Sequence, residues 1–162
     1  MCGILAVFGA VDDFVAAQAI EAADRLAHRG PDGRGVHVQT GVGVLCHRRL
    51  AIMDPEAGYQ PIYSRPVGEA GGAALIGAVV VHNGEIYNFR GLQQELAPRG
   101  CSFHSGSDSE VLAHLFEAMG DACVTHLDGI FAFAAMRTVA DGSVDWMVAR
   151  DPLGIKPLYY GR

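Results

Sequence analysis

Positive charge is scarce in this chain. Its 162 residues include 12 Lys and Arg against 18 Asp and Glu, which gives a formal net charge of -6, and charged residues make up only 19%. Proteins that bind nucleic acid ordinarily carry a basic patch or stripe. The acidic balance therefore speaks against a nucleic-acid partner and favours a mildly acidic protein that stays in solution.

Long apolar runs and export signals are lacking as well. The longest apolar run, residues 73–81, is interrupted by glycine and is far shorter than the roughly 20 residues that a membrane-spanning helix needs. The first residues do not show a charged region, an apolar stretch and a cleavage site in that order. The four cysteines have no Cys-x-x-Cys spacing. We therefore expect a cytoplasmic protein with reduced cysteines and no membrane insertion.

The sequence also has no recognisable metal or nucleotide motif. The seven histidines show no spacing of two histidines and one acid of the kind that binds zinc. Neither a Walker-type loop nor a glycine-rich phosphate loop of the form Ser-Gly-Gly-x-Asp-Ser occurs. We therefore expect this chain to hold no metal ion and to bind no ATP.

What is present is a pattern of short strands and helices that fits one domain. Apolar and β-branched runs bounded by turn residues predict strands, at residues 3–8, 36–38, 42–47, 74–82, 130–137 and 144–149, with 158–160 beginning one more. Apolar residues at three- and four-residue steps predict helices, at residues 14–27, 89–97, 111–119 and 121–127. Residues 28–35 and 54–72 are expected to be irregular. Helices between groups of strands indicate an α+β protein of sheet and helix layers.

Several loops combine glycine with groups that recognise charge. They are His28 to Gly33, His47 to Leu50 at a strand end, His82 to Glu85 at another strand end, and Ser107-Asp108 before a helix. Ser107 and Glu110 also have the spacing of a capping box. Each loop alone has an ordinary interpretation as a turn or a solvated charge. Together they predict one cleft, because strand ends and helix starts present side chains from rigid elements.

Cys2 is the most informative single residue because of its position. Removal of Met1 would leave a thiol and a free α-amino group on Cys2. Thiols have a reference pKa of about 8.5 and α-amines of about 7.7–8.0, so proton exchange between them is cheap near neutral pH. N-terminal nucleophiles use their own amine as base in this way. The alternative interpretation is that Met-Cys is a chance beginning of a buried strand.

Eight motifs, in order along nearly the whole chain, resemble those of class II glutamine amidotransferases. They are Cys2-Gly3-Ile4, His28-Arg29-Gly30-Pro31-Asp32, Arg49-Leu50-Ala51-Ile52, Gln60-Pro61, Asn83-Gly84-Glu85-Ile86-Tyr87-Asn88, Ser107-Asp108-Ser109-Glu110, Asp128-Gly129-Ile130-Phe131-Ala132-Phe133, and the run from Arg150 to Tyr159. Within that class, the chain is similar to the glutaminase domain of glutamine-hydrolysing asparagine synthetases. The resemblance implies a four-layer αββα sandwich of two mainly antiparallel sheets, of the N-terminal nucleophile hydrolase type, formed by residues 1–162 as a single domain.

The resemblance also implies a chemistry and a set of site residues. Cys2 would attack the side-chain amide of L-glutamine and form a thioester, with its α-amine as base. The side-chain amide of Asn83 and the N–H of Gly84 would hold the oxyanion. The substrate-binding residues would be Arg49 for the carboxylate, Asp108 and Glu85 for the ammonium, and Ile52. The guanidinium fork of an arginine suits a carboxylate.

The same resemblance implies partners that this chain lacks. The ATP-dependent synthetase domain is absent, and ATP and Mg are expected only there. We favour a fragment of a longer synthetase, which forms a homodimer when complete, over a stand-alone subunit. An end at Arg162 would leave a sheet edge open. Two alternatives stay open: a glutaminase that serves another acceptor, a sugar or a natural-product carboxylate, and a non-catalytic docking module that keeps Met1.

Overall fold

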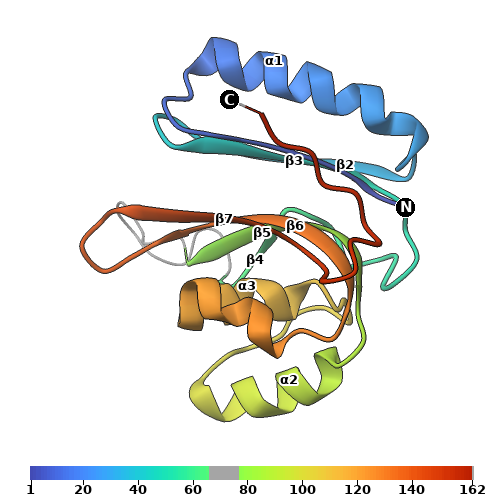
Figure 1. The fold of residues 1–162 in the computed structure, drawn as a ribbon, viewed down its shortest axis with the longest axis vertical. Coiled ribbons are helices and arrows are strands. Elements are labelled where there is room, and N and C mark those ends of the chain that lie inside the picture. Colours follow the sequence, from blue (N-terminus) through green and yellow to red (C-terminus); the bar gives the residue numbers. More distant parts are fainter. Residues whose placement is uncertain (66–76, 162) are drawn as a thin grey trace.

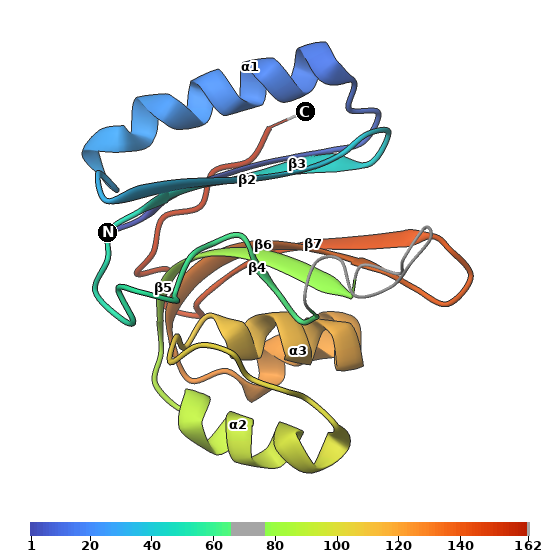
Figure 2. The same cartoon turned by 180° about the vertical axis from the view of Figure 1, so that it is seen from behind.

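Two β-sheets lie face to face, with helices on both outer sides. The computed structural model describes residues 1–65 and 77–161. Figures 1 and 2 show α1 above the first sheet, and α2 and α3 below the second sheet. This arrangement confirms the predicted αββα sandwich.

The first sheet has three antiparallel strands in the order β1-β3-β2, which are β1 (Gly3–Phe8), β2 (Gly33–Gln39) and β3 (Gly43–Arg49). Helix α1 (Asp13–Asp24) covers this sheet, and the side chain of Asp12 caps it by accepting from the N–H of Val15 at 2.8 Å. A 3-10 helix, Arg25–His28, follows. Strand β2 begins earlier than predicted, inside the expected loop 28–35, because Gly33 already pairs with Arg49 of β3.

The second sheet is also antiparallel, in the order β4-β5-β6-β7. Its strands are β4 (Ile62–Tyr63), β5 (Ala78–Ile86), β6 (Gly129–Thr138) and β7 (Val144–Arg150). Strand β5 does not end at His82 as predicted, because its pairing with β6 continues to Ile86 opposite Gly129. Its expected start at Ala74 lies outside the described residues. Strand β4 lies in the region 54–72 that was expected to be irregular, and residues 66–72 of that region are not described.

Helix α2 (Phe89–Leu96) and helix α3 (Glu110–Met119) confirm two predicted helices, and each is followed by 3-10 turns, at Ala97–Arg99 and Gly120–His126. The predicted capping box is wrong. The carboxylate of Glu110 accepts instead from the backbone N–H groups of His104 at 2.8 Å and Ser105 at 2.9 Å, so it holds the preceding loop.

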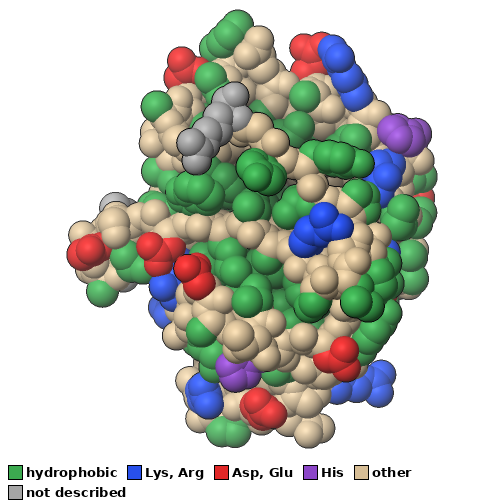
Figure 3. Space-filling model, viewed as in Figure 1, with side chains coloured by type: hydrophobic (Ala, Val, Ile, Leu, Met, Phe, Trp, Pro, Cys, Tyr) green, Lys and Arg blue, Asp and Glu red, His purple; other side chains and the backbone are tan. Residues whose placement is uncertain are grey.

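The predicted strand at 158–160 does not form. Among the described residues no strand pairs with this segment, and Tyr159 and Tyr160 are 90% and 92% exposed. It runs back across the molecule toward α1 (Figure 1). On this face hydrophobic side chains are gathered across the middle, as Figure 3 shows.

Three apolar clusters form the layers of the core. The largest joins the second sheet to α2 and α3, another joins α1 to the first sheet, and a third fills the space between the two sheets with Leu45, Val79, Val81, Ala134 and Met136. Polar residues replace this apolar filling where β1 begins and β3 and β5 end. The candidate site lies at this end. Among the described residues, no helix has the length and apolar character to cross a membrane.

Candidate active site

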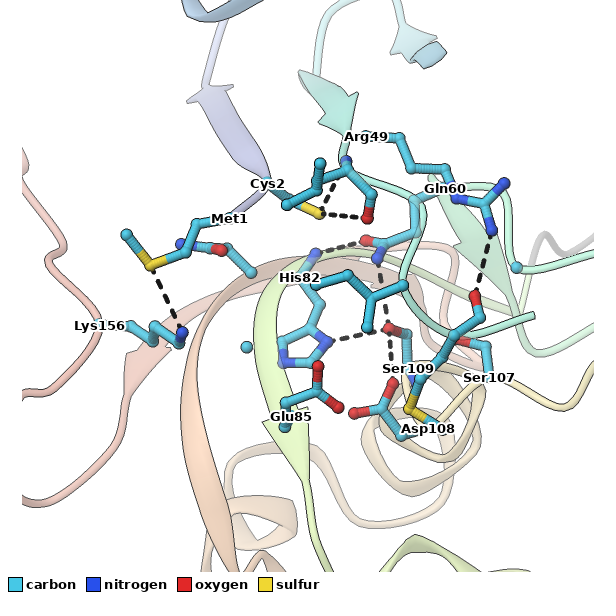
Figure 4. A pocket seen from close by; sticks show the side chains of 16 residues that line it. Met1, Cys2, Arg49, Gln60, His82, Glu85, Ser107, Asp108, Ser109 and Lys156 are labelled. Carbon is cyan, nitrogen blue, oxygen red and sulfur yellow. Dashed lines mark hydrogen bonds between the residues drawn. The ribbon is translucent and has the colours of Figure 1, made fainter. Parts of the chain in front are cut away.

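All seven residues that the sequence singled out line one pocket. The N-terminus before β1, the loop after β3, the end of β5 and the start of α3 supply its walls (Figure 4). The predicted residues in its lining are Cys2, Arg49, Ile52, Asn83, Gly84, Glu85 and Asp108. Met1, Gln60, His82, Ser109 and Lys156 also line it.

The Cys2 thiol lies against the first residue after β3. The N–H of Leu50 donates to Sγ at 3.4 Å, and Sγ lies 3.7 Å from the carbonyl oxygen of Leu50. The carbonyl oxygen of Cys2 accepts from Nε of Arg29 at 3.3 Å. These contacts fix a half-buried thiol at the pocket wall. Met1 is attached to it, so the α-amine of Cys2 is an amide in this form of the chain.

The outer edge of β5 offers a backbone donor to the pocket. The pairing with strand β4 ends at Val80, and within the described residues no strand pairs with this edge from there to Ile86. The N–H of His82 donates to Oε1 of Gln60, and the N–H of Ile86 donates to Oδ2 of Asp108, each at 2.6 Å. Alternate residues of a strand face the same edge, so the N–H of Gly84 points the same way, between these two. In the described part of the chain no side chain accepts from it, which leaves it available to a ligand.

Gly84 is required by its neighbours in the sheet. A Cβ at this position would lie 2.1 Å from the carbonyl oxygen of Ile130 and 2.6 Å from Cα of Phe131. The structure shows that the backbone of β6 already excludes a side chain.

The pocket contains two carboxylates. Burial raises the pKa of Asp108, and the N–H of Ile86 and the Ser109 hydroxyl and N–H oppose that rise. Burial also raises the pKa of Glu85, the charge of Asp108 adds to the rise, and the charge of Lys156 opposes it. Carboxylates that are costly to ionise are stabilised by a cation. The pair therefore suits a ligand ammonium group.

Arg49 is bound to its own loop. Its guanidinium donates from Nη1 to the carbonyl oxygen of Pro55 at 3.0 Å, and from Nη2 to those of Met53 at 3.2 Å and Asp54 at 2.6 Å. It also lies over the ring of Tyr59. A guanidinium has five N–H groups. The loop thus takes three of them, and within the described residues no acceptor takes the other two.

A hydrogen-bond network that we did not predict lies under the pocket. Oγ of Ser109 lies 2.9 Å from Nδ1 of His82 and accepts from Nε2 of Gln60 at 3.2 Å. Burial lowers the pKa of His82 to about 3, helped by the charges of His47 and Lys156, so its ring is neutral near pH 7. Gln60 and Ser109 stand in motifs that we recognised in the sequence. Their place in these motifs is the one sequence signal for the two residues, because the neighbouring sequence does not indicate which distant side chains they contact.

The sequence model of the glutamine amidotransferase domain family matches residues 1–162. The chain belongs to this family. It is 45% identical over 163 aligned residues to an asparagine synthetase [glutamine-hydrolyzing] of Brassica oleracea and to asparagine synthetase [glutamine-hydrolyzing] 3 of Arabidopsis thaliana. Each match covers 99% of this chain, but only 25% and 26% of the relative. The chain thus spans about a quarter of the length of these relatives.

A solved structure supports the same assignment. The glutamine phosphoribosylpyrophosphate (PRPP) amidotransferase from B. subtilis, complexed with ADP and GMP, matches with a TM-score of 0.69 and 25% identity, over 96% of this chain and 38% of that one. The resemblance to class II glutamine amidotransferases and the N-terminal nucleophile hydrolase fold are thereby confirmed. In the described ranges, 1–65 and 77–161, no group of three or more His, Cys, Asp or Glu is arranged to hold a metal ion.

Proposed function

We propose that this glutamine amidotransferase domain hydrolyses glutamine through a Cys2 thioester and supplies the ammonia to an ATP-dependent synthetase domain that makes asparagine from aspartate. The observation that carries the proposal is the convergence, in one pocket, of a thiol, a free backbone donor and a pair of carboxylates. These are a nucleophile, an oxyanion donor and an ammonium site.

The reaction begins when Sγ of Cys2 attacks the side-chain amide carbon of glutamine. The thiol proton passes to the α-amine of mature Cys2 and then to the leaving nitrogen, so ammonia departs as the C–N bond breaks. The product is a glutamyl thioester. Water then attacks the thioester, releases glutamate and restores the thiol. The net change is glutamine and water to glutamate and ammonia.

Asn83 and Gly84 are the proposed oxyanion donors. Asn83 is buried in the pocket lining beside Gly84. The N–H of Gly84 points outward from the open edge of β5. Such donors stabilise charge that develops only in the transition state, and removal of one costs about 10²–10³-fold in rate. The proposal therefore assigns them to catalysis rather than to substrate affinity.

The rest of the pocket is proposed to bind the amino-acid end of glutamine. Asp108 and Glu85 take the ammonium, and the two remaining N–H groups of Arg49 take the carboxylate. Ile52, which is 65% exposed, forms an apolar wall at the mouth. A site that binds both charges distinguishes free glutamine from a glutamine residue inside a peptide, because that residue has neither a free α-ammonium nor a free α-carboxylate.

Relatives named as asparagine synthetases at 45% identity support aspartate as the acceptor, against 25% for the PRPP amidotransferase. ATP and Mg belong in this proposal to the synthetase domain, as do the homodimer and the cytoplasmic location of the complete enzyme. Asparagine formation from glutamine, aspartate and ATP by the complete enzyme tests the acceptor. Asparagine formed from free ammonia but never from glutamine would reject this pairing.

The hydrolytic step is tested on the 162-residue chain itself. Glutamate release is measured for the parent chain, Cys2→Ala, and Cys101→Ala as a control on a half-buried cysteine outside the pocket. We expect Cys2→Ala alone to abolish turnover, and hydroxylamine to divert the parent's product to the γ-glutamyl hydroxamate. Equal turnover by Cys2→Ala and its parent would reject Cys2 as nucleophile. A parent with a free Cys2 N-terminus and no turnover would favour the docking module.

A further inference from the structure

The side chain of Gln60 lies beside a part of β5 with which no strand of the described residues pairs on that edge. Strand β4 pairs with β5 at only two positions, Ile62 with Val80 and Tyr63 with Val79. An antiparallel partner continued in the same register would place residue 60 opposite His82. Here the Gln60 side chain takes over, and its Oε1 accepts from the N–H of His82 at 2.6 Å. The hydrogen-bonded edge of β5 therefore continues past the end of β4.

The other end of the Gln60 amide reaches helix α3. Its Nε2 donates to Oγ of Ser109 at 3.2 Å, and Oγ lies 3.4 Å from Oδ1 of Asp108. Because the N–H of His82 requires an acceptor, the oxygen and nitrogen of the amide are assigned without ambiguity. Gln60 thus connects the loop before β4, strand β5 and the start of α3 (Figure 4).

The same edge is fixed on the other side of Gly84. The N–H of Ile86 donates to Oδ2 of Asp108 at 2.6 Å. Gly84 lies midway between His82 and Ile86, so its peptide is held from both sides. Through Ser109, the two holding points belong to one network.

We propose that Gln60 is a positioning residue for glutamine hydrolysis: it acts as a substitute strand that directs the Gly84 N–H at the amide oxygen of glutamine, which becomes the oxyanion when Cys2 attacks. The inference rests on the proposed function for its kinetic consequence. The oxygen and one N–H of the Gln60 amide are engaged within the protein, and the inference assigns the effect of Gln60 to β5 rather than to substrate binding. A donor misplaced by about 1 Å can cost about 10²-fold in rate.

The test compares Gln60→Leu, Gln60→Glu and Ser109→Ala in the chain with a mature Cys2 N-terminus. Leucine keeps the approximate shape without an acceptor, and we expect kcat to fall about 10²-fold with KM within about threefold. Glutamate restores the acceptor for His82, so we expect it to recover at least about tenfold of that loss. Ser109→Ala keeps the bond from His82 to Gln60 and loosens Asp108, so we expect its main effect in KM.

Two readouts separate positioning from a loss of fold. The rate of Cys2 alkylation by iodoacetamide should be unchanged in Gln60→Leu, because the thiol contacts Leu50 rather than Gln60. Exchange of the His82 amide hydrogen, measured by NMR, should accelerate in Gln60→Leu and return toward the parent rate in Gln60→Glu.

The exchange measurement needs no turnover, so it tests the substitute strand even if the parent proves inactive, which would reject the proposed function alone. Unchanged exchange of the His82 amide hydrogen in Gln60→Leu would overturn the inference. So would a kcat within threefold of the parent, or an equal loss of kcat in Ser109→Ala. If Gln60→Leu does not fold, Gln60→Met, which also lacks an acceptor for the N–H of His82, takes its place in the same exchange measurement.

Discussion

Nζ of Lys156 lies 3.5 Å from Sδ of Met1, in the pocket that also holds Cys2. Lys156 is only 9% exposed, and in the described part of the chain no carboxylate oxygen lies within 4 Å of its ammonium. A thioether is a weak acceptor. Met1 therefore occupies pocket space beside an ammonium group that no nearby carboxylate of the described residues compensates.

Removal of Met1 should switch the site on. A cleavable fusion can release either a chain that begins with Met1 or one that begins with Cys2, and the intact mass verifies each. We expect glutamate release to be about 10²–10⁴-fold faster from the Cys2 form, because only that form has the α-amine as a general base. Equal turnover by the two forms would show that the amine takes no part in the reaction.

Arg49→Lys should harm both the loop and the substrate site. A lysine ammonium is a point charge and cannot hold the three carbonyl oxygens of Met53, Asp54 and Pro55 that Arg49 holds. Each hydrogen bond to a charged group contributes about 1.5–3 kcal/mol, so we expect a lower midpoint of unfolding and a KM for glutamine raised about 10–100-fold. Urea unfolding and steady-state kinetics measure the two effects.

The matched control for that variant is Arg48→Lys, because Arg48 makes a single contact with Asp24 at 3.5 Å and does not line the pocket. We expect its KM to equal that of the parent. A raised KM in both variants would point to the charge of the whole segment instead of to the guanidinium of Arg49.

Asp108→Asn should separate substrate binding from stability. The pKa of Asp108 is raised by burial, so its ionised form weakens the fold at neutral pH, and this cost disappears as pH falls and the carboxyl is protonated. Asparagine keeps an oxygen for the N–H of Ile86 without the charge. We expect the variant to unfold at an equal or higher urea concentration at pH 7.5, with a much higher KM for glutamine.

An exposed carboxylate serves as the comparison for Asp108. Glu56 lies on the loop after β3 and does not line the pocket, so Glu56→Gln should change neither stability nor KM. If Asp108→Asn unfolds more readily than its parent, burial is not the dominant influence on this carboxyl group.

The sequence located the pocket residues better than it located the connections between them. Cys2 and Asp108 stand next to predicted element ends, so simple topology brings them together. His82 lies 22 positions from Gln60, and Met1 lies 155 positions from Lys156, so a local sequence pattern does not reveal either contact. The sequence predicts that the strand ends before Asn83-Gly84. Strand β5 continues through this glycine, because pairing with β6 overrides the low strand preference of a single glycine. Glu110 similarly abandons the capping box because the N–H groups of a nearby loop compete for its carboxylate.

Two buried histidines should make the fold sensitive to acid. Burial lowers the pKa of His47 to about 4 and that of His82 to about 3. His47 lies against the backbone of His82, which opposes the shift, but neither of its ring nitrogens has a hydrogen-bond partner of ordinary geometry within the described residues. Both rings are therefore neutral in the folded chain near pH 7.

The sign of the effect follows from proton uptake by the unfolded chain. Unfolded histidines titrate at about pH 6.5, so below that pH the unfolded chain binds protons that the folded chain refuses. The contribution of these histidines to the free energy of unfolding should be constant above about pH 7. It should fall as pH falls toward the folded pKa values, by on the order of 1.4 kcal/mol per pH unit for each such histidine.

His47→Phe should remove one of these contributions. The variant keeps an aromatic ring between the sheets, so we expect the slope of unfolding free energy against pH, between pH 6 and 4.5, to be lower by on the order of 1.4 kcal/mol per unit. His126→Gln, at an exposed position, should leave the slope unchanged. Urea unfolding at a series of pH values measures both. An unchanged slope in His47→Phe would mean that His47 is already protonated in the folded chain, and its burial between the sheets would then need a counter-charge that the described residues do not supply.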